Sequence, residues 1–393
     1  MKITIFPANN GDSFLLETDQ DNILIDGGYV NTYKEFLKPI LRELNLLKKK
    51  INHLIVTHVD NDHISGIIKL IEENNNNSII EIENIWHNSY KHLKSIEDGI
   101  TFPGKPAHSM MINYELKDEK DGIIDSDISA VQGSTLASLL RKNSFESRDS
   151  FLRNNHISFD TSNVIYDDDL TFRILSPNNE KLLDLKKYWK RELFTKGYSS
   201  DEELTNFNED IFEYILSQEK GKKRLKKKNI NASTEISIEN LLKDPFSEDD
   251  SPTNGSSIAF VLEYADLKFL FLADSHPSLI LENLQKHYKA EEFPIKFDLI
   301  KISHHGCKNN TSPELLNFID SENYIISTNG LSHNHPDLET IARIISRKTT
   351  FTRKLYFNYE LDVLEGFLNE DLQKKYNYRI IQNKTKKPIS ITF

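Results

Sequence analysis

Thr57-His58-Val59-Asp60-Asn61-Asp62-His63 is the stretch of sequence that decides the fold. It places two imidazoles and two carboxylates in one short loop, directly after the strand-like residues 53–56. Divalent ions such as zinc, manganese and iron accept imidazole and carboxylate ligands together. A loop that only capped the following helix would need one such residue. The pattern therefore predicts a metal site at the end of a strand.

The same layout, an apolar strand followed by ligand-type side chains, recurs later in the chain. The strand-like residues 269–273, 299–302 and 324–328 lead to Asp274, to His304 and His305, and to His333 and His335. A lone Asp or His at a strand end is usually a hydrogen-bonding group. Four such strand ends in order favour convergence of these side chains on one site.

The rhythm of strands and helices around these segments indicates an α/β fold. Alternating patterns over residues 3–6, 13–17 and 22–26 predict three strands, and the spacing of apolar residues over 33–47 predicts a helix. A comparable succession of strands and helices runs from residue 257 to the C-terminus. Two such halves predict two sheets packed face to face with helices outside.

Residues about 178–250 carry amphipathic helical patterns and little strand signal. We therefore expect one domain over residues 1–393 with a mainly helical insertion at about 178–250. This insertion is also a candidate docking surface for a protein partner.

Composition limits the class of protein. With 38% apolar and 28% charged residues the chain has the balance of a soluble globular protein. Its apolar runs are far shorter than the ~20 residues that span a bilayer, and its first residues lack the apolar stretch of a signal peptide. A single cysteine, Cys307, fits a reducing compartment. These features predict a cytoplasmic protein without membrane contact, whose metal is held by His and carboxylates.

Nucleic-acid binding would need a local basic surface, because the net charge is −11. One candidate is the dense basic run Lys220–Lys228, which lies between acidic stretches. The alternative interpretation is a solvated loop whose charge serves solubility.

The segment His58-x-Asp60-x-Asp62-His63 resembles the metallo-β-lactamase signature His-x-His-x-Asp-His. The order of the other segments resembles the hydrolase domain of the ComEC-type DNA-uptake proteins. This likeness rests on residues 10–13, 23–28, 257–274, 303–308 and 311–314, and it covers about 1 to 90 and 250 to 345. The resemblance implies a four-layer αββα metallo-β-lactamase sandwich.

The resemblance also implies a set of site residues. One metal would be held by His58, Asp60 and Asp274, and a second by Asp62, His63, Asp274 and His333, so that Asp274 bridges the two. Asp62, His304 and His305 would be the catalytic side chains, with His304 or His305 contacting substrate or leaving group. His333 is preferred to His335 because it stands three residues before Pro336.

Two departures from the family pattern affect the first metal. Asp60 stands where the family usually has histidine, which makes this site harder and more tolerant of manganese. No histidine lies between His156 and His276, so the usual ligand before the bridging aspartate has no obvious counterpart. The replacement could come from His87, His108, His156 or Asn254, or the first metal could bind weakly.

The leading hypothesis is a metal-dependent nuclease or phosphodiesterase that uses one or two zinc or manganese ions to ionise a water molecule. Lys308 or protonated His305 could stabilise charge on the phosphate. Cys307 is disfavoured as a nucleophile because it lies beside the metal site. One alternative is a hydrolase of small esters, cyclic nucleotides or lactones, and the other is a binding module with a degenerate metal site.

Overall fold

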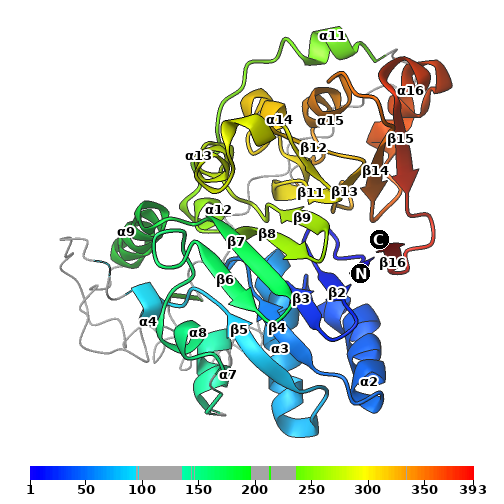
Figure 1. Cartoon of the computed structure of the whole chain (residues 1–393). Coiled ribbons are helices and arrows are strands. Elements are labelled where there is room, and N and C mark those ends of the chain that lie inside the picture. Colours follow the sequence, from blue (N-terminus) through cyan, green and yellow to red (C-terminus); the bar gives the residue numbers. More distant parts are fainter. Residues whose placement is uncertain are drawn as a thin grey trace.

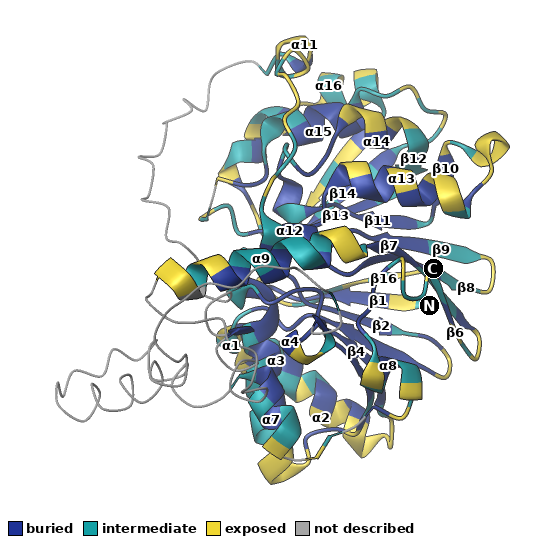
Figure 2. Ribbon diagram, turned by 90° about the vertical axis from the view of Figure 1, so that its left-hand side faces the viewer, coloured by how far each residue is buried: buried dark blue, intermediate teal, exposed yellow. Residues whose placement is uncertain are grey.

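The computed structural model describes residues 1–93, 96, 135–142, 144–145, 147–195, 212–213, 236–332 and 334–393. Two large sheets lie face to face at the centre of the molecule, and helices cover their outer faces (Figure 1). In Figure 2 the strands are mostly buried, whereas the outer helices have exposed sides. This mixed α/β architecture confirms the predicted fold class.

The first sheet has six strands in the order β16-β1-β2-β3-β4-β5. Their bounds are β1 Lys2–Ile5, β2 Phe14–Glu17, β3 Asn22–Ile25, β4 Ile51–Ile55, β5 Ile82–Trp86 and β16 Ile389–Thr392. The first three strands, which the alternating patterns predicted, are antiparallel neighbours, whereas β3, β4 and β5 run parallel. Parallel neighbours need helical crossovers, and α1 Val30–Thr32, the π-helix Tyr33–Leu37, α2 Lys38–Leu46 and α3 Asn61–Asn77 lie in these crossovers.

The second sheet has eight strands in the order β15-β14-β13-β11-β9-β8-β7-β6. Their bounds are β6 Val164–Asp167, β7 Leu170–Ser176, β8 Ala259–Tyr264, β9 Leu267–Phe271, β11 Leu299–Lys301, β13 Asn323–Ile326, β14 Arg353–Phe357 and β15 Tyr378–Gln382. From β9 to β15 neighbouring strands are parallel. The helices between these strands include α13 Pro277–His287, α14 Pro313–Phe318, α15 Leu338–Ile345, the 3-10 helix Asp362–Leu368 and α16 Glu370–Tyr376. The strands β10 Ile295–Phe297 and β12 Ile319–Ser321 form a small separate sheet.

Apolar side chains from both sheets fill the space between them. Phe14 and Ile25 of the first sheet pack in one buried cluster with Phe260, Phe271 and Ile325 of the second. Two further clusters lie between each sheet and its own helices. Since alternate side chains of a strand point to opposite faces, each sheet is buried on both sides and the molecule has four layers.

The middle of the chain adds the long helix α9 and several short helices to this scaffold. They are α4 Tyr90–Leu93, α7 Leu136–Lys142, α8 Ser150–Asn154, α9 Asn179–Thr195, α11 Ile238–Leu241 and α12 Pro252–Gly255. The helix α9 agrees with the predicted helical pattern, but residues 196–211 and 214–235, with the basic run Lys220–Lys228, lie outside the described residues. The single domain with a helical insertion therefore stays a prediction.

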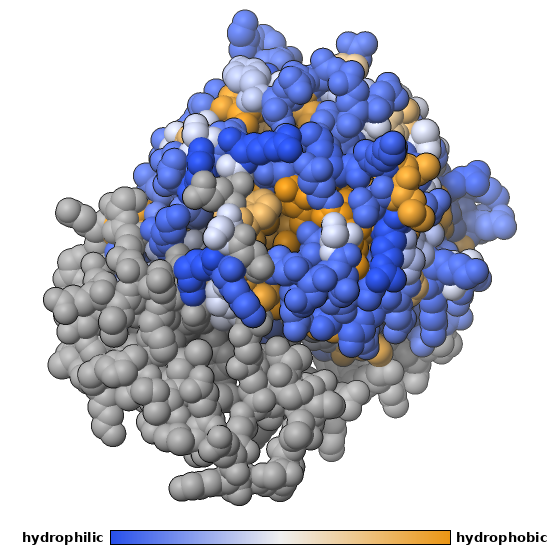
Figure 3. All heavy atoms as spheres, turned by 90° about the horizontal axis from the view of Figure 1, so that it is seen from below, coloured by the Kyte–Doolittle hydropathy of each residue, from blue (hydrophilic) through white to orange (hydrophobic). Residues whose placement is uncertain are grey.

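Seen from below, the surface is largely hydrophilic around a limited apolar area (Figure 3). Among the described residues, no helix is long and apolar enough to cross a membrane.

Close backbone contact fixes α3, the helix that carries part of the predicted metal-site loop. Gly66 N–H donates to the Gly28 carbonyl at 2.8 Å, and Gly27 N–H donates to the His63 carbonyl at 2.9 Å. A Cβ atom on Gly66 would lie 2.0 Å from the Gly27 carbonyl oxygen. The absence of a side chain at residue 66 therefore lets α3 sit directly against the loop after β3.

We predict that Gly66→Ala lowers the free energy of unfolding by about 1–3 kcal/mol, the usual cost of overpacking a filled site. In an unobstructed helix the same change stabilises. The exposed Asn75, on the same helix, provides the control Asn75→Ala. Chemical denaturation of the two variants checks this prediction, and equal stability of Gly66→Ala and wild type would contradict the close packing.

Candidate metal centre

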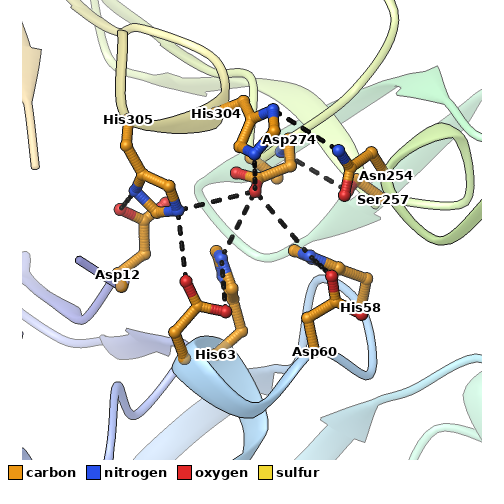
Figure 4. A network of polar contacts seen from close by, with 12 residues as sticks. Asp12, His58, Asp60, His63, Asn254, Ser257, Asp274, His304 and His305 are labelled. Carbon is orange, nitrogen blue, oxygen red and sulfur yellow. Dashed lines mark hydrogen bonds and ion pairs between the residues drawn. The ribbon is translucent and has the colours of Figure 1, made fainter. Parts of the chain in front are cut away.

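The predicted ligands come together where strands of the two sheets end (Figure 4). His58 lies in the loop after β4, and Asp62 and His63 lie in the first turn of α3. Asp274 follows β9, and His304 and His305 belong to the short 3-10 turn His304–Gly306 after β11. The helix α3 already begins at Asn61, so two of the ligand candidates, Asp62 and His63, are held by helical backbone.

Asp274 stands at the centre of this group. Its Oδ2 atom lies 3.9, 3.6, 3.9 and 3.5 Å from the Nε2 atoms of His58, His63, His304 and His305, respectively. Two ligand atoms that share a zinc ion at ~2.1 Å in tetrahedral geometry lie about 3.4 Å apart. These separations are too long for hydrogen bonds but suit atoms that share a cation.

Two further carboxylates extend the group. Asp62 Oδ2 lies 3.4 Å from His305 Nε2, and Asp62 Oδ1 lies 3.9 Å from His63 Nε2. Asp60, the residue before α3, places its Oδ2 3.7 Å from His58 Nε2. The structure therefore brings together His58, Asp60, Asp62, His63 and Asp274, five of the six predicted metal ligands.

The imidazole rings are held from behind through their Nδ1 atoms. His63 Nδ1 lies 2.8 Å from Asp26 Oδ2, and His58 Nδ1 lies 3.1 Å from Thr57 Oγ1. His304 Nδ1 lies 2.9 Å from Asn310 Oδ1, and His305 Nδ1 lies 2.9 Å from the Ser327 carbonyl oxygen. Such partners orient the ligating histidines of metal sites and fix their tautomers. Each ring thereby turns its Nε2 atom toward Asp274.

Several buried polar atoms at this centre have no hydrogen-bond partner among the described residues. They are the Nε2 atoms of His58, His63 and His305 and the Oδ1 atom of Asp274. Buried polar groups in proteins nearly always have a partner. A divalent cation among these atoms would supply it, so the donor set fits a metal ion.

The ionisation of His58 and Asp274 suits metal binding. Burial, followed by the charge of His63, lowers the pKa of His58 well below its usual value, so this imidazole is neutral at pH 7. Burial alone would raise the pKa of Asp274, but the charges of His305 and His63 outweigh it and lower that pKa well below the usual range. Both side chains therefore carry the lone pairs that a cation needs. At His63 and His305 burial is outweighed by the charge of Asp274, which raises the pKa, so each of these two imidazoles must lose a proton to bind a cation.

The remaining predicted residues have different outcomes. His333 lies outside the described residues, so its role as a ligand stays a prediction. His335 is buried, and its ring centroid lies 5.2 Å from that of His304. His304 or His305 was expected to contact substrate, and the Nε2 atom of His305 lies among the ligand candidates.

The candidates for the missing family ligand can now be placed. His87 Nε2 lies 2.7 Å from Glu213, and His156 Nε2 lies 2.9 Å from Asn179, so both are engaged with other partners. His108 lies outside the described residues. Asn254 Nδ2 lies 3.4 Å from His304 Nδ1 at the edge of the centre.

Two charged residues that the sequence did not single out as functional support the centre. Lys301 is buried in β11, pairs with Asp12, and has its Nζ 3.8 Å from Asp274 Oδ1. It also donates to the Ala273 carbonyl at 3.0 Å, which fixes the loop that carries Asp274. A buried charge needs a charged partner. The lysine within an apolar strand was therefore the sequence feature that could have indicated a buried ion pair at this centre.

The structure also bears on Lys308 and Cys307. Lys308 Nζ lies 2.7 Å from Asp244 and 3.5 Å from Glu339, so its charge is already balanced by two carboxylates.

Burial raises the pKa of the Cys307 thiol to about 12. A thiol that remains protonated at neutral pH is a poor nucleophile, which agrees with the interpretation from sequence.

Residues 7–129 match the model of the metallo-beta-lactamase superfamily. This match includes the loop with His58 and His63 and ends before Asp274. No curated protein matches the chain.

Among solved structures, the chain is similar to the metallo-beta-lactamase fold protein YhfI from Bacillus subtilis, with 12% identity, a TM-score of 0.36, and coverage of 99% of this chain and 98% of the other. It is also similar to a mutant of the CmlA beta-hydroxylase, with 9% identity and a TM-score of 0.34. In that comparison the alignment covers 100% of this chain and 54% of the other.

We predict that Asp274→Asn lowers metal affinity by at least about 100-fold, because loss of a ligand costs no less than loss of an outer partner. Asp266→Asn is the matched control, since Asp266 is exposed in the β8–β9 turn of the same sheet. Elemental analysis after equilibrium dialysis against zinc or manganese measures the bound metal. Full occupancy in Asp274→Asn would remove this residue from the metal site.

A substitution of Asp26 tests whether the hydrogen bond that orients His63 contributes to metal affinity. Its carboxylate accepts hydrogen bonds from Thr57 N–H at 2.8 Å and from Thr57 Oγ1 at 2.7 Å, and it holds His63 Nδ1. We predict that Asp26→Asn weakens metal binding by about 10–100-fold. Competition with a chromogenic chelator measures the affinity, and thermal unfolding of the metal-free protein controls for folding. Unchanged affinity in a folded variant would argue against this role.

Proposed function

We propose that this chain, whose N-terminal part carries a metallo-β-lactamase superfamily domain, is a metal-dependent hydrolase that cleaves phosphodiesters, nucleic acids among them. The observation that carries the hydrolase assignment is the position of Asp274. One buried carboxylate oxygen faces the Nε2 atoms of four histidines at 3.5–3.9 Å. This superfamily consists mostly of hydrolytic enzymes that use divalent metals.

We assign the ligands from the distances. His58, Asp60 and Asp274 would hold one ion, and Asp62, His63, Asp274 and His305 would hold a second. His305 thus takes the place in the second set that the resemblance gave to His333. When bound, such ions lower the pKa of water to roughly 7 and stabilise negative charge on substrate oxygens.

His304 is assigned to substrate because it is the accessible member of the four. Its side chain is 23% exposed, whereas those of His58, His63 and His305 are at most 4% exposed. Asn310 fixes its Nδ1 atom, so the Nε2 atom can exchange a proton with a leaving group beside Asp274. This is the role of a general acid.

We favour phosphodiesters as substrates for two reasons, the carboxylates among the assigned ligands and a cation near the centre. Three of the assigned ligands are carboxylates, and hard oxygen ligands suit the manganese and magnesium ions that accompany phosphates. At the rim, Lys181 Nζ on α9 lies 3.0 Å from His276 Nδ1. His276 and His304 both lie 3.8 Å from Asp249 Oδ2, so this cation is linked to the centre by a short chain of polar side chains.

The proposal is tested with purified, metal-stripped protein supplied with manganese or zinc. Substrates are linear double-stranded DNA, single-stranded DNA and bis(4-nitrophenyl) phosphate. We predict metal-dependent cleavage that falls at least about 100-fold in Asp274→Asn and is unchanged in Asp266→Asn, because Asp274 is an assigned ligand and Asp266 is not. A protein that holds metal and cleaves none of these substrates would refute the phosphodiesterase assignment.

A second comparison separates nucleic acid from small esters. The variant replaces every cation of the basic run by glutamine, at Lys220, Lys222, Lys223, Arg224, Lys226, Lys227 and Lys228. For a nuclease, DNA cleavage should fall and lose its dependence on salt, while turnover of the small ester is retained. If DNA cleavage is unaffected, the basic run does not bind the substrate.

A further inference from the structure

A second group of metal-binding side chains lies beside the centre already described. It consists of His304, Cys307 and His335, whose ligand atoms lie within 4.8 Å of one another. Cys307 and His335 are each 8% exposed. The phosphodiesterase proposal uses neither the thiol nor His335.

The backbone holds these three residues in place through direct links between two loops. Cys307 N–H donates to the His304 carbonyl at 2.9 Å, which closes the turn between them. Asp337 N–H donates to the Gly306 carbonyl at 3.1 Å, and Lys308 N–H donates to Asp337 Oδ2 at 2.8 Å. The loop that carries His335 is thereby joined to the turn that carries the other two residues.

The side chains are arranged for a shared ligand as well. The His304 and His335 rings lie with centroids 5.2 Å apart. His335 Nδ1 lies 3.6 Å from Asp337 Oδ2, so a carboxylate stands beside this ring at a distance longer than a hydrogen bond.

We propose that His304, Cys307 and His335 form a further metal site, and that this site takes zinc. A thiolate with two imidazoles is a softer donor set than the carboxylate-rich centre around Asp274, and soft donors favour zinc over manganese or magnesium. Binding replaces the thiol hydrogen by a sulfur–zinc bond, and the proton leaves to solvent. The two neighbouring sites therefore differ in the metal that they prefer.

Occupation of this site would control the hydrolytic centre, a consequence that rests on the proposed function. His304 Nε2 lies 3.9 Å from Asp274 Oδ2 and is assigned above to the substrate. An ion held with Cys307 and His335 would engage the same imidazole and remove it from proton transfer. Zinc in excess of the amount that fills the main centre should therefore inhibit.

Cobalt, a spectroscopic substitute for zinc, tests the site directly in the full-length protein. The sequence contains one cysteine, so any thiolate-to-cobalt charge-transfer band in the near ultraviolet reports Cys307. We expect this band to appear when cobalt is titrated into the wild-type protein and to be absent in Cys307→Ser. In His335→Asn the affinity for cobalt, measured from this band, should be at least tenfold weaker. The band should persist in Asp274→Asn, which disrupts only the main centre.

Two results would overturn the proposal. One is a wild-type protein that shows the visible bands of bound cobalt without the charge-transfer band. The other is loss of the charge-transfer band in folded Asp274→Asn, which would place the thiol in the main centre. Retention of the visible cobalt bands in Cys307→Ser controls for its folding.

The inhibitory consequence is measured separately, as hydrolysis of bis(4-nitrophenyl) phosphate against added zinc. We expect Cys307→Ser to need at least tenfold more zinc than wild type for half-inhibition. Equal sensitivity would refute the regulatory role. A charge-transfer band in a protein without any hydrolytic activity would uphold the metal site and count against the proposed function alone.

Discussion

The structure depends on one electrostatic constraint, the burial of the Asp274 carboxylate among imidazoles. Removing a carboxylate from water is costly unless opposite charge or hydrogen bonds compensate. Here Lys301 approaches one oxygen, and the Nε2 atoms of four histidines surround the other at distances too long for hydrogen bonds. A shared cation resolves this arrangement, because it satisfies the carboxylate and the imidazoles together.

The fold brings the residues around Asp274 together from two different sheets. His58 and His63 follow β4 of the first sheet, whereas Asp274 and His305 follow β9 and β11 of the second. The ligands therefore meet only when the two sheets pack against each other. A cation at this point would tie the sheets together, so metal binding and stability of the sandwich are linked in the same contacts.

Much of this arrangement could be predicted from the sequence, because strand ends and ligand-type residues are local patterns. The loop from His58 to His63 and the position of Asp274 were recognisable in this way. The different partners of His304 and His305 were not. Both residues have positive φ angles in a tight turn, so neighbouring side chains point to different partners, which spacing along the chain cannot reveal.

The central claim is that Asp274 and His63 share a bound cation. A crystal structure of the metal-loaded protein, with anomalous diffraction measured on both sides of the zinc or manganese absorption edge, tests it most directly. The account predicts an anomalous peak in contact with Asp274 Oδ2 and His63 Nε2, with His305 and Asp62 beside it. A metal-loaded crystal with no peak at Asp274, or with Asp274 hydrogen-bonded directly to His63 in its place, would contradict it.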